Sequence, residues 1–106
     1  MITVIIRYSG TDGNAKKFIK EMQSLKIVDE IRKEDGNIRY EYFYPIDDEE
    51  SIVLIDSWID QEALNRHHLS PVMNKISQLR DKYNLHMKVE KYQLIIDDID
   101  EKYIRK

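Results

Sequence analysis

The spacing of hydrophobic and polar side chains changes several times along the chain, and four segments have the pattern of β-strands. Residues 2–8 (ITVIIRY) and 51–59 (SIVLIDSWI) are rich in β-branched and aromatic side chains, which is typical of strands. Residues 37–45 (NIRYEYFYP) and 85–93 (LHMKVEKYQ) alternate in character, as the two faces of a sheet require. One face of the second predicted strand carries Ile38, Tyr40, Tyr42 and Tyr44.

Helical periodicity fills most of the sequence between these strands. Over residues 15–34, apolar side chains recur every three or four positions, which predicts one long amphipathic helix. Asp60 precedes residues 61–68, and aspartate is a preferred N-cap, so a short helix is expected there. A third apolar stripe runs through residues 72–83. Taken together, the elements follow the order βαββαβ.

This order predicts an α+β, ferredoxin-like fold in which helices cover one face of a four-stranded antiparallel sheet. The strand at residues 51–59 is apolar on both sides, so we expect the other face to be apolar and covered as well. A second copy of the chain would cover it, which predicts a homodimer in the form of a dimeric α+β barrel. The domain is expected to span residues 1–92. Residues 93–106 form a C-terminal extension, either an extra strand, a swapped arm or a frayed end.

Composition narrows the class of protein. The 106 residues include 17 basic and 20 acidic side chains and no cysteine, which excludes disulfides, thiolate nucleophiles and zinc–cysteine sites. Basic residues are scattered rather than clustered, so nucleic acid is not the expected partner. The start lacks the features of a signal peptide, and no apolar run is long enough to span a membrane. We expect a soluble cytoplasmic protein with no membrane partner.

The pair His67-His68 is the most conspicuous candidate for chemistry. Adjacent residues on a helix point about 100° apart, so the two imidazoles do not converge on one ion, and no metal is expected. His67 shares the helical face of Ala63, and one histidine of the pair should face inward. A neutral imidazole beside a pocket can accept a proton from a phenol. The alternative is a histidine that only packs its helix.

Two motifs resemble the antibiotic biosynthesis monooxygenase (ABM) family, of which the small quinol monooxygenases are typical. The first is EDGNIRYEYF, with Glu34, Gly36, Tyr40 and Glu41 at the positions of the family pattern. The second is SWIDQEALNRHHLSP, which matches at Trp58, Ala63, Leu64, His67, Ser70 and Pro71. The resemblance covers residues 2–92 and selects His67 as the inward histidine.

The resemblance implies a sheet-to-sheet dimer with a small pocket between sheet and helices. It also implies oxidation of a quinol-like aromatic substrate by O2 without metal, flavin or haem. On this basis we predict His67 as the catalytic base, Trp58 and Met73 as pocket walls, and Tyr42 as a contact to substrate. Haem degradation is not expected, because the residues used by that branch are replaced here by Ile6, His67 and Ser77.

Two other functions stay open at the level of the sequence. An isomerase or another enzyme acting on a small polar metabolite would be favoured by a pocket lined with cations. A non-catalytic dimer that binds a small ligand would be favoured by a pocket filled with the protein's own side chains.

Overall fold

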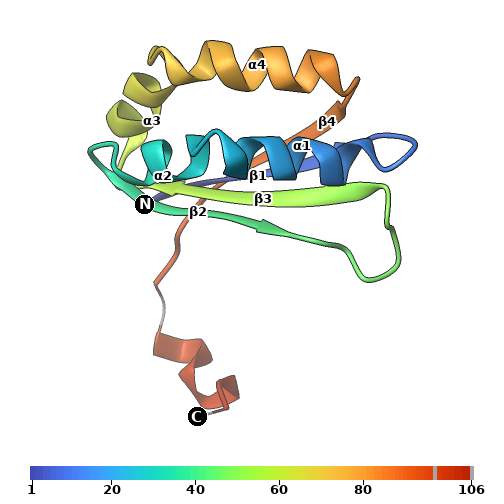
Figure 1. Cartoon of the computed structure of the whole chain (residues 1–106). Helices are drawn as coiled ribbons and strands as arrows, with labels where there is room; N and C mark the ends of the chain where they lie inside the picture. Colours follow the sequence, from blue (N-terminus) through green and yellow to red (C-terminus); the bar gives the residue numbers. More distant parts are fainter. Residues whose placement is uncertain (97, 106) are drawn as a thin grey trace.

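Four antiparallel strands carry all the helices of the domain on one face (Figure 1). The computed structural model describes residues 1–96 and 98–105. Its elements are β1 (Ile2–Ser9), α1 (Asn14–Ser24), α2 (Ile27–Arg32), β2 (Asn37–Phe43), β3 (Ser51–Trp58), α3 (Gln61–His68), α4 (Val72–Lys82), β4 (His86–Gln93) and the 3-10 helix η1 (Asp98–Tyr103). The predicted ferredoxin-like α+β fold with a four-stranded antiparallel sheet is confirmed.

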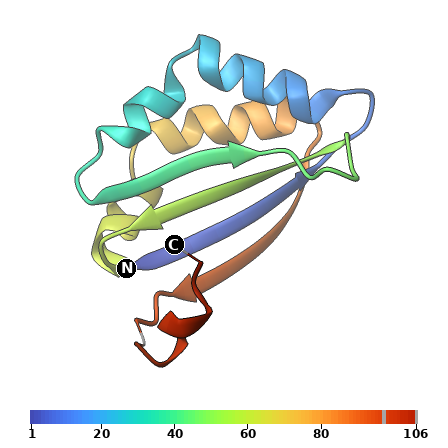
Figure 2. The same cartoon turned by 90° about the horizontal axis from the view of Figure 1, so that it is seen from below.

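The sheet has the strand order β2-β3-β1-β4, so the first and third strands along the chain lie at its centre. β1 and β3 pair over their full lengths, from Ile2 opposite Trp58 to Ser9 opposite Ser51. Alternate residues of these two strands point toward the helices and are buried there. β4 pairs with β1 and forms one edge of the sheet, on the side away from α1 and α2 in Figure 2. The helix face of β4 is therefore left partly uncovered.

The helix predicted over residues 15–34 is interrupted. α1 ends at Ser24, and Lys26 has the left-handed backbone angle φ 57° before α2 begins at Ile27. A continuous helix would turn Ile27 about 140° away from Met22, since each residue advances about 100°. The break instead lets both residues be fully buried. Burial of apolar side chains therefore determines the path of the chain between α1 and α2.

A bulge in β2 changes one of the predicted faces. The pairing of β2 with β3 shifts between Asn37 and Arg39, which removes Ile38 from the alternation of the strand. Ile38 is 51% exposed, whereas Tyr40 is 1% exposed. The prediction that Ile38 shares a face with Tyr40 is wrong, because a single extra residue on one strand reverses the direction of its side chain.

The face of the sheet away from the helices is open and mixed in character. At its centre lie Ile5, Val53 and Ile55, which are half-buried by their own neighbours. Charged side chains such as Arg7 and Glu41 surround them. The expectation of an apolar open face therefore holds for its middle only. An apolar centre within a polar rim is the usual make-up of a protein–protein interface.

The C-terminal extension begins where β4 ends. The backbone N–H of Leu94 donates to the carbonyl of Met1, and residues 94–96 have no regular secondary structure. η1 follows and lies beyond the sheet on the side opposite the helices (Figure 1). None of the helices in the described part of the chain is long and apolar enough to span a membrane.

Candidate functional site

Trp58, the last residue of β3, and His67, on α3, are packed against each other in the interior. Their rings stack with centroids 4.7 Å apart and planes inclined by 27°. Trp58 is 0% and His67 3% exposed, so the expectation that His67 is the inward histidine is confirmed. Their contact follows from the chain path, because the turn at Asp60 folds α3 back over the end of β3. The Asp60 carboxylate accepts from the N–H of Ala63, as expected of an N-cap.

The two sequence motifs converge at this contact. Nδ1 of His67 donates to the carboxylate of Glu34 at 2.9 Å, because an ionised carboxylate can only accept. Gly36 has φ +85°, and a Cβ at this position would lie 2.6 Å from the Cβ of Ala63. Only glycine fits the turn that brings β2 under α3. The motif residues thus join the end of α2, the start of β2 and α3 into one packed unit.

A buried carboxyl group lies next to this unit. Asp56, on the helix face of β3, accepts a hydrogen bond from Nε1 of Trp58. Burial raises the pKa of Asp56 to about 7, although the bond from Trp58 opposes the shift. The negative charge of Glu34 raises this pKa further, and Arg80 lowers it. Asp56 is therefore close to half-protonated at neutral pH.

A groove of about 400 Å³ lies where the helices leave the edge of the sheet uncovered. Side chains of β1 and β4 line it together with α3 and α4, and the volume falls within the range of small-molecule sites. Its lining consists of Val4, Ile6, Gln61, Leu64, His68, Met73, Arg80, Met87, Val89 and Lys91. The groove therefore has a largely apolar surface with a few polar groups, which is the usual composition of a ligand site.

His68 of α3 is a titratable group that lines the groove. Partial burial lowers the pKa of His68 below its ordinary value, and electrostatic interactions with His67, Arg80 and Lys91 act in the same direction. Its imidazole is therefore neutral at pH 7 and can accept a proton. Arg80 donates from Nε and Nη2 to the hydroxyl of Tyr8, at 3.1 and 2.8 Å. This contact fixes the guanidinium at the groove wall.

The four predicted site residues do not meet in one cavity. Met73 lies in the wall of the groove. His67 and Trp58 are stacked on each other behind α3, and neither is among the residues that line the groove. Tyr42 lines a different cavity. Their roles in catalysis and substrate contact therefore remain predictions.

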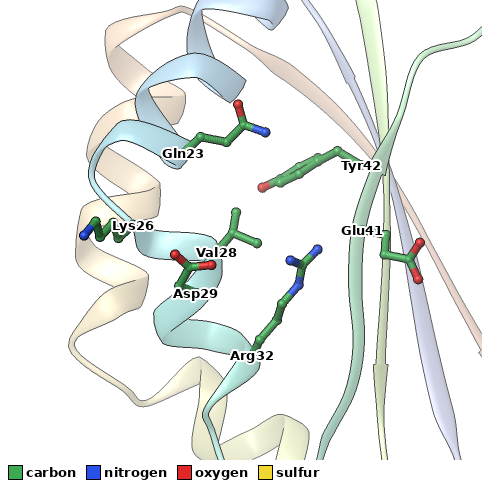
Figure 3. A pocket seen from close by; sticks show the side chains of 7 residues that line it. All are labelled: Gln23, Lys26, Val28, Asp29, Arg32, Glu41 and Tyr42. Carbon is green, nitrogen blue, oxygen red and sulfur yellow. The ribbon is translucent and has the colours of Figure 1, made fainter.

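That second cavity has a volume of about 480 Å³ and is named here the α2 cavity. It lies between β2 and the junction of α1 with α2, and it is lined by Gln23, Lys26, Val28, Asp29, Arg32, Glu41 and Tyr42. The ring of Tyr42 extends from β2 toward α2, and the guanidinium of Arg32 rises into the same space (Figure 3). The hydroxyl of Tyr42 lies 3.1 Å from that of Tyr40.

The sequence profile described as "Antibiotic biosynthesis monooxygenase" matches residues 1–79. The chain belongs to this family. YcnE of Bacillus subtilis (strain 168), whose name contains the word monooxygenase, is 34% identical over 53 residues. That alignment covers 50% of this chain and 54% of YcnE, so the chain spans about half the length of the curated relative it matches.

Two solved structures share the architecture of this chain. PA3566 from Pseudomonas aeruginosa has a TM-score of 0.76 at 22% identity, with 90% of this chain and 94% of that chain covered. SnoaB from Streptomyces nogalater, described as a cofactor-independent oxygenase, has a TM-score of 0.74 at 16% identity, with coverages of 91% and 94%. At these identities the likeness establishes the fold alone.

Several polar residues of this ABM protein were missed by sequence reasoning. Glu34 was recognised only as part of a motif, and Asp56 only as a strand residue. His68 was passed over in favour of its neighbour, although helical spacing places it on the face of Leu64, which also lines the groove. Arg80 carried no signal, because its importance depends on α4 lying beside β4. In the described part of the chain, no three histidine or carboxylate side chains are grouped as a metal site requires.

Proposed function

We propose that the chain is a cofactor-independent monooxygenase that oxidises a small quinol-like aromatic substrate with O2 in the groove. The observation that carries the proposal is a neutral imidazole, His68, in a groove whose other surfaces are largely apolar. Family membership supports the same reaction class.

The chemistry requires the substrate to act as the reductant. Removal of a proton from a hydroxyl leaves an electron-rich phenolate ring, which can donate an electron to O2. One oxygen atom is then added to the ring, the other leaves as water, and the quinol supplies all the electrons as it becomes a hydroxyquinone. Within this scheme His68 accepts the proton, and the apolar surface binds the ring.

His67, which was predicted from the sequence as the base, has a positioning role in this proposal. Its Nδ1–H is directed at Glu34 and its ring at Trp58. We propose that these contacts hold α3 in place, so that the next residue, His68, is presented to the groove. Trp58 then supports the site from behind, and Met73 forms part of its wall.

A homodimer forms part of the proposal. The open face of the sheet has Ile5, Val53 and Ile55 at its centre, and a second copy would remove them from water. We expect Ile55→Asp to give a monomer in light scattering, because a charge buried without a partner opposes association. A wild-type protein that is monomeric at micromolar concentration would contradict this part.

An enzyme acting on a small anionic metabolite is the second candidate, and the cations of the groove favour it. Arg80 and Lys91 both line the groove, and cation-lined pockets suit anionic substrates. The apolar surface beside them favours a ring over a sugar. The two candidates therefore share one site and differ in whether O2 is consumed.

The test is O2 uptake with a panel of hydroquinones, by wild type, His68→Asn and His67→Asn. We expect His68→Asn to lower kcat/KM by about 100-fold or more, because general-base catalysis contributes about that much. His67→Asn should mainly lower the melting temperature of the protein. The fraction that stays folded should lose little of its turnover. No uptake by any protein rejects the monooxygenase, and loss of turnover only in a folded His67→Asn variant would make His67 the base.

A further inference from the structure

All the ionisable side chains that line the groove are basic. They are His68, Arg80 and Lys91, and no carboxylate of residues 1–96 and 101–105 is among the lining residues. The chain as a whole has more acidic than basic residues and a formal net charge of −3. The positive character of the groove is therefore a local property of this site and does not follow from the overall composition.

Arg80 has no direct carboxylate partner among the described side chains, and Asp56 acts on its charge only without an ion-pair contact. Arg7, Arg39 and Arg66 each have a carboxylate partner, whereas no ion pair of Arg80 is found among residues 1–96 and 101–105, whose side chains the structure describes. Its partner is the hydroxyl of Tyr8, and the guanidinium also lies 5.4 Å from the centroid of that ring. A phenol is neutral at pH 7, and burial raises the pKa of Tyr8 further.

Lys91, on β4, contributes the second positive charge of the groove. Its Nζ donates to the side-chain oxygen of Gln61, which joins β4 to the first turn of α3. Within the same described residues, Lys91 also forms no ion pair with a carboxylate. Two fixed cations, one on α4 and one on β4, thus act on the same groove, and both retain N–H donors that a ligand can use.

Most of the remaining lining of the groove is apolar. Ile6 of β1 is opposite Val89 of β4, and Tyr8 is opposite Met87, so the side chains of Ile6, Val89 and Met87 point to the same face of the sheet. Leu64 and Met73 add apolar surface from the helices. Such a surface favours a planar ring over a hydroxyl-rich sugar, whose polar groups would lose their hydration without replacement.

We infer that the groove selects a planar aromatic compound that carries a carboxylate, with Arg80 and Lys91 as the groups that bind the carboxylate. This inference rests on the proposed function and specifies its substrate class. The planar guanidinium matches the two oxygens of a carboxylate. The ring then lies on the apolar surface, and its hydroxyl group is within the same groove as His68.

Binding can be tested without turnover by using a pair of ligands that differ only in charge. Naphthalene-2-carboxylate and its neutral analogue, naphthalene-2-carboxamide, have the same ring and nearly the same shape. We expect calorimetry of the wild type to show a preference of at least about tenfold for the carboxylate, because charge-assisted hydrogen bonds are about twice as strong as neutral ones. Arg80→Gln should abolish the preference.

Two further variants separate the charge of the groove from the stability of the fold. Lys91→Gln changes an exposed residue of an edge strand, and it should reduce the preference several-fold. The control is Arg66→Gln, which removes an equal charge on α3 from a residue whose partner is the exposed Asp35; it should keep the wild-type preference. Circular dichroism establishes that each variant is folded.

The outcomes distinguish the inference from the proposed function. Equal binding of the two ligands by the wild type, no binding of the carboxylate, or an unchanged preference in folded Arg80→Gln and Lys91→Gln would each overturn the inference. If only neutral hydroquinones drive O2 uptake, the inference fails and the monooxygenase stands. If the carboxylate binds through Arg80 but no aromatic acid or hydroquinone drives O2 uptake, the inference stands and the monooxygenase fails.

Discussion

The groove and the α2 cavity lie on the same side of the sheet and have similar volumes, about 400 and 480 Å³. Their charges differ. In the α2 cavity, Lys26 and Arg32 are offset by Asp29 and Glu41, and Arg32 already donates twice to the carbonyl of Tyr40. In the groove, the basic residues have no acidic counterpart among the lining residues that the structure describes.

This difference shows that volume alone does not identify a site. Where the charges of a cavity are balanced and its donors are engaged, a ligand must compete with existing contacts. Where cations with unused N–H donors lie beside an apolar surface, an anionic aromatic ligand can supply the negative charge that accepts from these donors and the ring that covers the apolar surface. This difference supports the proposal that the chemistry takes place in the groove, although the α2 cavity is larger.

Asp56 lies between the groove and the α2 cavity, opposite Val4 of β1 and Tyr40 of β2. Its substitution has the largest expected effect, which is on the free energy of unfolding. Its folded-state pKa of about 7 exceeds its ordinary value of 3.8. Between about pH 4 and about pH 7, Asp56 is therefore largely protonated in the folded protein and largely ionised in the unfolded chain. Stability should fall as the pH rises from about 4 to about 7 and then level off, by up to about 4 kcal/mol.

Asp56→Asn removes this contribution, because the amide stays neutral and can still accept from Trp58. Urea unfolding across this pH range should show the decline in the wild type and a flatter curve in the variant. The variant should also be the more stable protein above pH 7. Parallel curves for the two proteins would mean that Asp56 is ionised throughout.

Filling each cavity in turn tests the assignment directly. Met73→Trp adds bulk to the wall of the groove and should lower kcat/KM by about 100-fold, because a small displacement of the substrate has effects of this size. Gln23→Trp adds the same ring to the α2 cavity from an exposed position and should leave kcat/KM within about twofold of the wild type. The reverse result would move the site to the α2 cavity.

Glu34 tests whether the motif residues act through packing. Glu34→Ala leaves the buried Nδ1–H of His67 without its acceptor, at a cost of about 2 kcal/mol in the free energy of unfolding. Asp35→Ala is a matched control, since its carboxylate is exposed and lies 3.9 Å from Arg66; it should change stability by less than about 0.5 kcal/mol. Similar losses in the free energy of unfolding of the two variants would show that the Glu34–His67 hydrogen bond contributes no more to stability than the exposed contact of Asp35.

Tyr42 is expected to give the smallest effect. Tyr42→Phe removes the hydrogen bond to Tyr40 and should lower stability by about 1 kcal/mol without changing KM. The control is Tyr44→Phe, at an exposed position beyond β2. A rise in KM for Tyr42→Phe alone would instead support the prediction that Tyr42 contacts the substrate.

Local patterns were sufficient for most of the fold. Apolar spacing predicted the order of the elements and the inner face of the helix over residues 72–83, to which the buried Ile76 belongs. It failed at Ile38 and at the junction of α1 with α2, where a bulge and a left-handed residue change the direction of the following side chains. Such irregularities arise from packing between elements, which a periodicity cannot express.

The sequence by itself determined the order of the elements and the family, because both depend on patterns of residues close together in the chain. The inward direction of His67 was selected by the resemblance to that family. Only the tertiary structure decided where the groove lies and which groups enter it. Arg80 and Lys91 belong to separate elements, and their charges act together only because α4 lies beside the exposed edge of the sheet. The pKa of Asp56 likewise depends on burial by distant elements. Desolvation and electrostatic potential are properties of the packed molecule, so local sequence patterns do not reveal them.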